Sequence, residues 1–141
     1  MNSLSQSRFV LFPLGAKRFA LPAEKVAELA RPDRQQLFPH TTPLVTGVLV
    51  RRGAIVPVCD VAQVLVEKAP ARRFYLIATR EIGCTRELVA LPVTGECELA
   101  SADVLPPSNG LPKHVAGLLS LPNEIVELID LDKLVGSEGE A

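Results

Sequence analysis

The residue types that most often do chemistry in proteins are sparse in this chain. It contains two histidines, His40 and His114, and three cysteines, Cys59, Cys84 and Cys97. Neither histidine has a second histidine or a cysteine at a metal-ligand spacing nearby, so we expect no metal site and structural or surface roles for both. Three scattered cysteines cannot pair completely into disulfides, which favours a reducing compartment.

Two aspartates and one cysteine remain as candidates for catalysis. Asp60 and Asp130 occupy equivalent places in the two halves of the chain, and paired aspartates on duplicated barrels are the catalytic arrangement of aspartic proteases. Those enzymes place a small hydroxyl residue and a glycine after each aspartate, whereas residues 61–62 and 131–132 are Val-Ala and Leu-Asp. We therefore expect both aspartates to cap helices, and we expect Cys59 to be an inert buried thiol. No glycine-rich phosphate loop follows any predicted strand, so the sequence predicts a protein that is not an enzyme and has no cofactor.

The elements that position these residues must come from one domain of ordinary size. The chain has 141 residues, of which 48% are hydrophobic and 22% charged, which is enough apolar material for a core. Its longest apolar stretches, such as 44–50 and 88–93, fall far short of the roughly 20 residues that cross a bilayer. A net charge of −1 with five phenylalanines and one tyrosine argues against nucleic-acid binding. The first seven residues lack the basic start and apolar run of a signal peptide, so we expect a cytoplasmic protein.

The pattern along the chain predicts a mainly β protein. Twelve prolines and nine glycines interrupt it, and the apolar runs between them are short. Four pairs of such runs predict neighbouring strands: 8–14 with 18–21, 45–50 with 54–59, 74–79 with 87–93, and 115–119 with 125–129. A short helix of one or two turns is expected after each of the two aspartates, while residues 24–30 fit either a helix or a strand.

An internal repeat is the strongest signal in the sequence. A shift of 70 residues aligns the two halves without a gap: Leu21-Pro22 falls on Leu91-Pro92, 47–49 on 117–119, Ile55-Val56 on Ile125-Val126, and Asp60 on Asp130. Each copy is too small to bury much surface alone, so the two should pack together and share a core. We therefore predict two small pseudo-symmetric β-barrels with short helices and a groove between them. They form a single domain over residues 8–135, with flexible tails at 1–7 and 136–141.

The repeat also predicts particular turn and core residues. Gly53 falls on Asn123, and these two residue types most readily accept a positive φ, so both should close tight hairpins. The apolar positions shared by the two copies should be buried: Val48, Ile55 and Val58 in the first copy, and Leu118, Ile125 and Leu128 in the second.

Three stretches carry a resemblance to a known family. They are Phe-Ala-Leu-Pro at 19–22, Lys-Val-Ala-Glu-Leu at 25–29, and G-V-L-V-R-R-G-A-I-V-P-V-C-D-V at 47–61. The last resembles the G-V-x-x-x-R-G-x-I-V-P-V-x-D-L run that follows an earlier V-x-E-I in the CheW family of chemotaxis coupling proteins. The resemblance covers residues 8–135, and the chain departs from it at Val50, where many members have asparagine.

The resemblance implies a fold of two intertwined five-stranded β-barrels and a function without catalysis. Members of the family are adaptors that join the cytoplasmic tips of methyl-accepting chemoreceptors to a CheA-type histidine kinase, whose regulatory domain shares the fold. Val26, Glu28, Gly47 and Arg52 fall on positions that contribute to receptor or kinase contacts in the family. Neither a cofactor nor membrane insertion is implied.

A second kind of binding protein remains open as an alternative: a small-barrel module that recognises peptides outside chemotaxis. The repeat helps to separate fold from function. Arg51-Arg52-Gly53 in the first copy becomes Leu121-Pro122-Asn123 in the second, so the turn itself needs no arginine. We therefore expect Arg52 to be dispensable for folding and to serve binding instead.

Overall fold

The computed structural model describes residues 7–30, 36–37, 45–66, 74–82, 84–107 and 109–134. Strands dominate it, and they run as follows: β1 Ser7–Leu14, β2 Lys17–Pro22, β3 Val26–Ala30, β4 Gln36–Leu37, β5 Val45–Arg51, β6 Ala54–Cys59, β7 Phe74–Ile82, β8 Thr85–Val93, β9 Glu98–Ala102, β10 Val104–Leu105, β11 Val115–Leu121 and β12 Glu124–Ile129. A short 3-10 turn η2 (Ala23–Lys25) precedes β3, and a short helix α1 (Ala62–Leu65) follows β6. No helix among these residues is long and apolar enough to span a bilayer.

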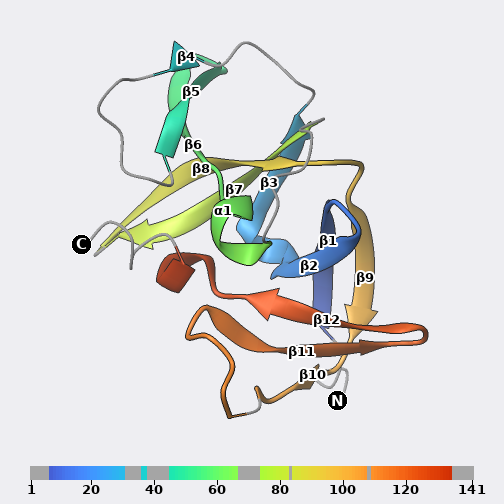
Figure 1. Cartoon of the computed structure of the whole chain (residues 1–141). Helices are drawn as coiled ribbons and strands as arrows, with labels where there is room; N and C mark the ends of the chain where they lie inside the picture. The colour runs from blue at the N-terminus through green and yellow to red at the C-terminus, as the bar shows by residue number, and fades with distance from the viewer. Residues whose placement is uncertain are drawn as a thin grey trace.

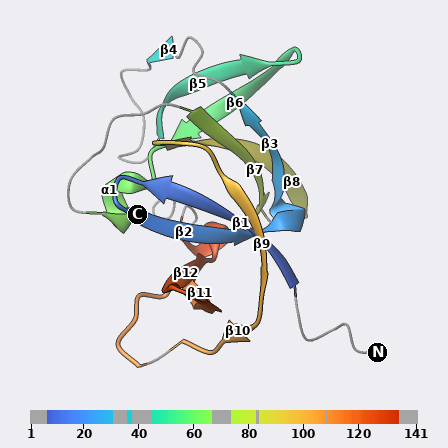
Figure 2. The same cartoon turned by 90° about the vertical axis from the view of Figure 1, so that its right-hand side faces the viewer.

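The strands form two sheets, one in each half of the molecule (Figures 1 and 2). Subdomain A has the strand order β10-β11-β12-β2-β1-β9, and subdomain B has the order β3-β7-β8-β6-β5-β4. Each sheet has five strands of five residues or more, together with one edge strand of two residues. The predicted mainly β fold with two β subdomains is confirmed.

The two subdomains exchange strands. The hairpin β1–β2 from the start of the chain joins β9–β12, and the hairpin β7–β8 joins β3–β6. Each exchanged hairpin joins its sheet through one antiparallel pairing, β1 with β9 or β7 with β3, and one parallel pairing. The two parallel pairings join Leu128 with Ala20 in subdomain A and Val58 with Ala90 in subdomain B. These two pairings are related by the 70-residue shift, so the sequence repeat is also a structural repeat. Each sheet therefore needs strands from both halves of the chain.

Three apolar clusters hold the strands together. One lies inside each subdomain, around Leu119 and Val126 in A and around Val56 and Ile77 in B. The third contains side chains of both sheets, including Phe19, Leu21, Leu76, Leu91 and Ile129. This third cluster is the shared core that two undersized repeats require.

Of the six residues predicted to be buried, four are buried or half-buried and two are exposed. Val48, Val58 and Leu128 are buried, and Leu118 is half-buried. Ile55 and Ile125, expected in the cores, are 71% and 65% exposed, whereas Val56 and Val126 beside them are buried. Side chains alternate between the two faces of a strand, so only one member of each Ile-Val pair can face inward.

The two repeat-related turns also differ from each other. Gly53 has a φ of 80° and Arg52 a φ of 53°, as the mirror-image hairpin turn requires. Asn123 has no positive φ, so its predicted equivalence to Gly53 is wrong. Pro122 fixes a negative φ at the first turn position, so the mirror-image turn formed by Arg52 and Gly53 is excluded in this copy.

The predictions of two helix caps and of the N-terminal tail were partly right. The side-chain Oδ1 of Asp130 accepts the backbone N–H of Lys133 at 3.2 Å, which confirms a helix cap ahead of the helical residues 131–134. Helix α1 instead begins after Val61, so the cap predicted at Asp60 is wrong by one residue. Ser7, expected in the N-terminal tail, begins β1, while His40 and the residues 1–6 and 135–141 lie outside the described chain.

Candidate functional site

The tip of the β5–β6 hairpin places two arginines beside a glutamate of β3. Arg51 Nη2 donates a hydrogen bond to Glu28 Oε1 at 3.0 Å, and Arg52 Nη2 lies 3.9 Å from the same oxygen. The side chains of Glu28 and Arg51 are about three-quarters buried, whereas that of Arg52 is 83% exposed. The structure therefore brings two of the four predicted partner-binding residues together, Glu28 and Arg52. It adds Arg51, which the sequence analysis had not singled out.

Val26 lies on β3 close to this cluster. It pairs with Ala78 of β7, a β-bulge separates it from Glu28 along the strand, and its side chain packs partly against the shared core. Its half-buried side chain contributes an apolar surface next to η2. Val26 and Glu28 thus form one continuous edge of subdomain B.

Gly47 lies at the other end of the same hairpin. It is buried on β5, between Leu37 of β4 and Val58 of β6. Arg52 is five positions further along the chain, about 16 Å away at 3.3 Å per residue. A Cβ on Gly117, its counterpart in the repeat, would lie 2.7 Å from Val104 Cγ1 and 2.9 Å from Leu105 O. The glycine at this position in subdomain A therefore permits the close approach of β10 to β11.

A pocket of about 290 Å³ opens where the two subdomains meet. Its lining includes Leu21 of β2 and Leu131 and Asp132 after β12 from subdomain A, Thr79 of β7 from subdomain B, and Lys25 of η2. This pocket is the groove predicted between the two copies of the repeat. Lys25, which lines it, directly precedes Val26 in the chain.

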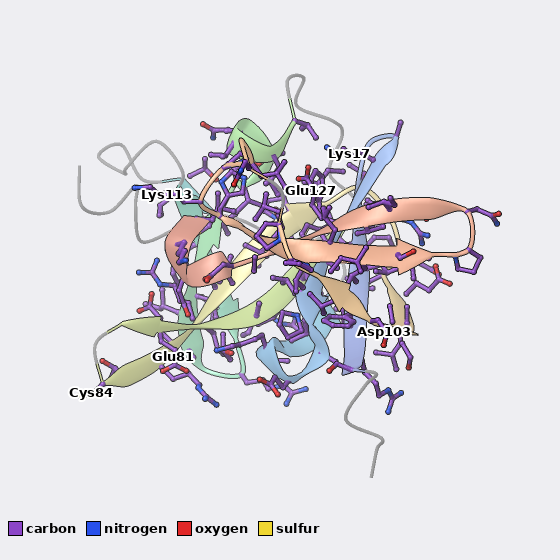
Figure 3. The ribbon with its side chains drawn as sticks, turned by 90° about the horizontal axis from the view of Figure 1, so that it is seen from below. Lys17, Glu81, Cys84, Asp103, Lys113 and Glu127 are labelled. Atoms are coloured by element: carbon purple, nitrogen blue, oxygen red, sulfur yellow. The ribbon has the colours of Figure 1, made fainter. Side chains whose placement is uncertain are left out.

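A polar network ties the rim of this groove together across the two subdomains. Asp132 Oδ1 accepts the backbone N–H of Glu81 at 2.7 Å, and Lys25 Nζ lies 3.8 Å from Glu81 Oε2. Figure 3 shows Glu81 near the end of the β7–β8 hairpin, whose tip carries Cys84. The groove is therefore an apolar floor with a charged rim, which suits binding of an amphipathic segment.

Burial shifts the pKa values of two residues that often do chemistry, Cys59 and His114. Burial raises the pKa of the Cys59 thiol to about 11, so the reactive thiolate is scarce at neutral pH. Burial lowers the pKa of His114, with Glu127 acting in the opposite direction. Within the described part of the chain, no three side chains of the His, Cys, Asp and Glu types lie close enough to hold a metal ion.

Two exposed apolar residues of the hairpin were missed by the sequence analysis. Val50 and Ile55 are cross-strand partners on β5 and β6, and their side chains are 61% and 71% exposed. Strict alternation along β6, with Val56 and Val58 inward, would have placed Ile55 outside. Val50 carried its own signal, because it replaces an asparagine of the family pattern and a polar residue there indicates a solvent-facing position.

Comparisons with known proteins agree on one family. The model of the CheW-like domain matches residues 8–139. The protein FrzA of Myxococcus xanthus is 27% identical over 139 residues, which cover 92% of this chain and 86% of FrzA. A probable chemotaxis protein CheW of Rhizobium etli is 26% identical, over 100% of this chain and 97% of that protein.

The fold is shared with a solved structure. The crystal structure of the scaffolding protein TtCheW from Thermoanaerobacter tengcongensis superposes with a TM-score of 0.77 and 21% identity, over 91% of this chain and 86% of that one. The family match spans nearly the whole chain, both subdomains included. The chain therefore belongs to the family of proteins with a CheW-like domain.

Proposed function

We propose that this protein is a non-catalytic adaptor of bacterial chemosensory signalling. It couples the cytoplasmic tips of methyl-accepting chemoreceptors to a CheA-type histidine kinase and works in the cytoplasm, where those tips lie. The observation that carries the proposal is the CheW-like match over residues 8–139, together with the two-subdomain fold. A protein named FrzA and a probable chemotaxis protein CheW, both similar over most of the chain, support it.

The geometry suits two modes of binding. The groove between the subdomains can receive apolar side chains from a helical hairpin such as a receptor tip. The regulatory domain of the kinase would then dock on the β subdomains themselves. Neither mode needs chemistry at the adaptor, because kinase activity can be controlled by a change in how its partners are held.

Within this adaptor, we assign partner binding to Val26, Glu28, Gly47 and Arg52. The four residues differ in exposure, and we assign each a role in binding accordingly. Arg52 is free to contact a partner directly, Val26 and Glu28 form the half-buried edge beside it, and the buried Gly47 shapes the hairpin that carries it. Arginine is enriched among residues that dominate binding energy at interfaces, which favours Arg52 as the principal contact.

A titration with two variants tests this assignment. Arg52→Ala should leave the melting temperature nearly unchanged and weaken association with a chemoreceptor cytoplasmic fragment or the kinase regulatory domain at least tenfold, equivalent to about 1.4 kcal/mol. Arg52→Glu should weaken it further. The matched control is Lys113→Glu, the same charge reversal on an exposed residue of subdomain A (Figure 3), and it should bind normally.

The outcomes separate the adaptor from the peptide-binding alternative. A wild-type chain that retains neither probe in a pull-down is not a chemosensory adaptor, and a peptide-binding module outside chemotaxis becomes the better description. A wild-type chain that binds both probes, with Arg52→Glu binding equally well, keeps the adaptor function and removes Arg52 from its interface.

A further inference from the structure

We propose that Arg51 is a positioning residue: it holds the Glu28 carboxylate and thereby leaves Arg52 free to bind a carboxylate of a protein partner. This inference rests on the proposed function, in which the hairpin tip is a partner-binding surface. It concerns a residue outside the four positions assigned to binding above.

The distances rank the two arginines clearly. Glu28 has one carboxylate for two guanidinium groups, and Arg51 Nη2 is at hydrogen-bond distance, 3.0 Å, while Arg52 Nη2 is at 3.9 Å. The Arg51–Glu28 pair is also the more buried one, so water and salt screen it less. Arg51 therefore neutralises Glu28, and the cluster keeps one positive charge, which is on Arg52.

Backbone geometry holds Arg52 in the exposed position. Arg51 is the last residue of β5 and pairs with Ala54 of β6, and its side chain reaches Glu28 of β3. Arg52 has left-handed backbone geometry, with a φ of 53°, in the two-residue turn that it forms with Gly53. The two consecutive arginines therefore differ in exposure and in contacts, because Arg51 ends a strand and Arg52 occupies the turn.

The repeat in subdomain A supports a holding role for Arg51. Glu98 on β9 is the counterpart of Glu28, and it too is held by an arginine: Arg18 Nη1 of β2 lies 2.6 Å from Glu98 Oε1. Arg18 also contacts Glu124 at the tip of the β11–β12 hairpin. In each subdomain an arginine therefore contacts the equivalent glutamate.

Only subdomain B then adds a further arginine at the hairpin turn. The residues that replace Arg51 and Arg52 in the other copy are Leu121 and Pro122, so the hairpin of subdomain A presents no free cation at its turn. The charge on Arg52 is thus additional to what the repeated fold uses for its own ion pairs.

The partner chemistry follows from this free charge and its neighbours. An exposed guanidinium binds a carboxylate through two parallel N–H donors. The exposed apolar side chains of Val50 and Ile55 lie on the same hairpin, within a few residues of Arg52. The surface fits a protein segment that presents an aspartate or glutamate next to apolar side chains.

The test compares Arg51→Leu, Glu28→Gln and the double variant in calorimetric titrations with a chemoreceptor cytoplasmic fragment and with the kinase regulatory domain. Leucine is the residue that the repeat itself places at this position, so the hairpin should fold normally. In Arg51→Leu, Glu28 is released to pair with Arg52. We expect an affinity about tenfold lower for the partner that binds this tip, with a shallower salt dependence.

The double variant is the decisive arm. With Glu28→Gln added, no carboxylate on β3 captures Arg52, so the double variant should bind within about twofold of Glu28→Gln alone, which carries the loss of any direct contact made by Glu28, and more tightly than Arg51→Leu. If Arg51 only stabilised the fold, removing the charge of its partner Glu28 as well would not restore binding affinity. Wild-type affinity in Arg51→Leu, or a double variant as weak as Arg51→Leu alone, would overturn the proposal.

A stability measurement keeps this inference distinguishable from the proposed function. A double-mutant cycle on the free chain should give a larger coupling between Arg51 and Glu28 than between Arg52 and Glu28. Equal or reversed couplings contradict the assignment whether or not any partner binds. If the wild-type chain binds neither probe, the proposed function fails and the partner role of Arg52 fails with it, while the cycle still decides which arginine holds Glu28.

Discussion

Alanine substitutions at the two Ile-Val pairs test which strand faces form the cores. The pairs are Ile55-Val56 in subdomain B and Ile125-Val126 in subdomain A. In each pair the isoleucine is more than three-fifths exposed and the valine is 1% exposed. Side-chain size alone predicts the larger loss from truncating isoleucine, whereas the structure predicts the larger loss from truncating valine.

The magnitudes follow from burial. Val→Ala removes two fully buried methyl groups at about 0.8 kcal/mol each and leaves a cavity, so the free energy of unfolding should fall by about 2 to 3 kcal/mol. Ile→Ala removes three carbons, but most of the side chain is already in water, and the loss should stay below about 1 kcal/mol. For a chain of this size these losses correspond to roughly 8 to 12 °C and less than 4 °C in melting temperature.

Urea unfolding of the four variants, followed by far-UV circular dichroism, measures these losses. Intrinsic fluorescence is a poor probe here, since the chain has no tryptophan and one tyrosine. The repeat provides an internal replicate, because Ile55 should behave like Ile125 and Val56 like Val126. An Ile55→Ala variant that loses as much stability as Val56→Ala would show that Ile55 belongs to the core and that the strand faces are assigned wrongly.

Three further substitution and labelling experiments test the local geometry. Gly53→Val should cost about 1 to 3 kcal/mol because its φ of 80° strains a β-branched residue, while Gly53→Asn should cost much less; equal melting temperatures would contradict the turn assignment. Gly117→Ala should cost about 1 to 3 kcal/mol because its Cβ would meet Leu105 O at 2.9 Å, whereas Gly95→Ala, with its nearest atom at 3.5 Å, should stay within about 0.5 kcal/mol. Cys84 should react with a thiol reagent in the folded chain and Cys59 only after unfolding, since Cys59 is buried. Fast labelling of Cys59 in the folded chain would refute its burial. Burial also raises the pKa of Cys59 to about 11, so the stability that its protonated thiol contributes is fully present below its unfolded pKa near 9 and is lost as the pH rises from there towards 11. A Cys59→Ala variant should lack that part of the loss of stability at alkaline pH.

Features encoded by neighbouring residues were predictable from the sequence. The hairpin around Gly15, the strands on either side of Gly53 and the helix cap at Asp130 all depend on a few consecutive residues, and the structure has each of them. One error arose where one copy of the repeat was used to predict the other. Asn123 follows a proline that Gly53 does not, so an equivalent position acquired a different turn.

The candidate site depended more on three-dimensional packing. The sequence indicated Glu28 and Arg52 through a family pattern, but the closer partner of Glu28 is Arg51, 23 residues away in the chain. Which of two adjacent arginines reaches a carboxylate depends on the strand register and on the turn conformation, and neither is visible in residue types alone.

The pattern of apolar runs, turn residues and a 70-residue repeat is a property of the chain alone, and it is enough to specify a duplicated β fold. Local hydrogen bonding and side-chain alternation act over a few residues, so the order of the amino acids is enough to determine the strands and turns. The exchange of the β1–β2 and β7–β8 hairpins, the outward position of Ile55 and the distances of Arg51 and Arg52 from Glu28 arise only when distant strands pack. Packing decides them because burial and ion pairing depend on neighbours in space, which long-range strand pairing brings together.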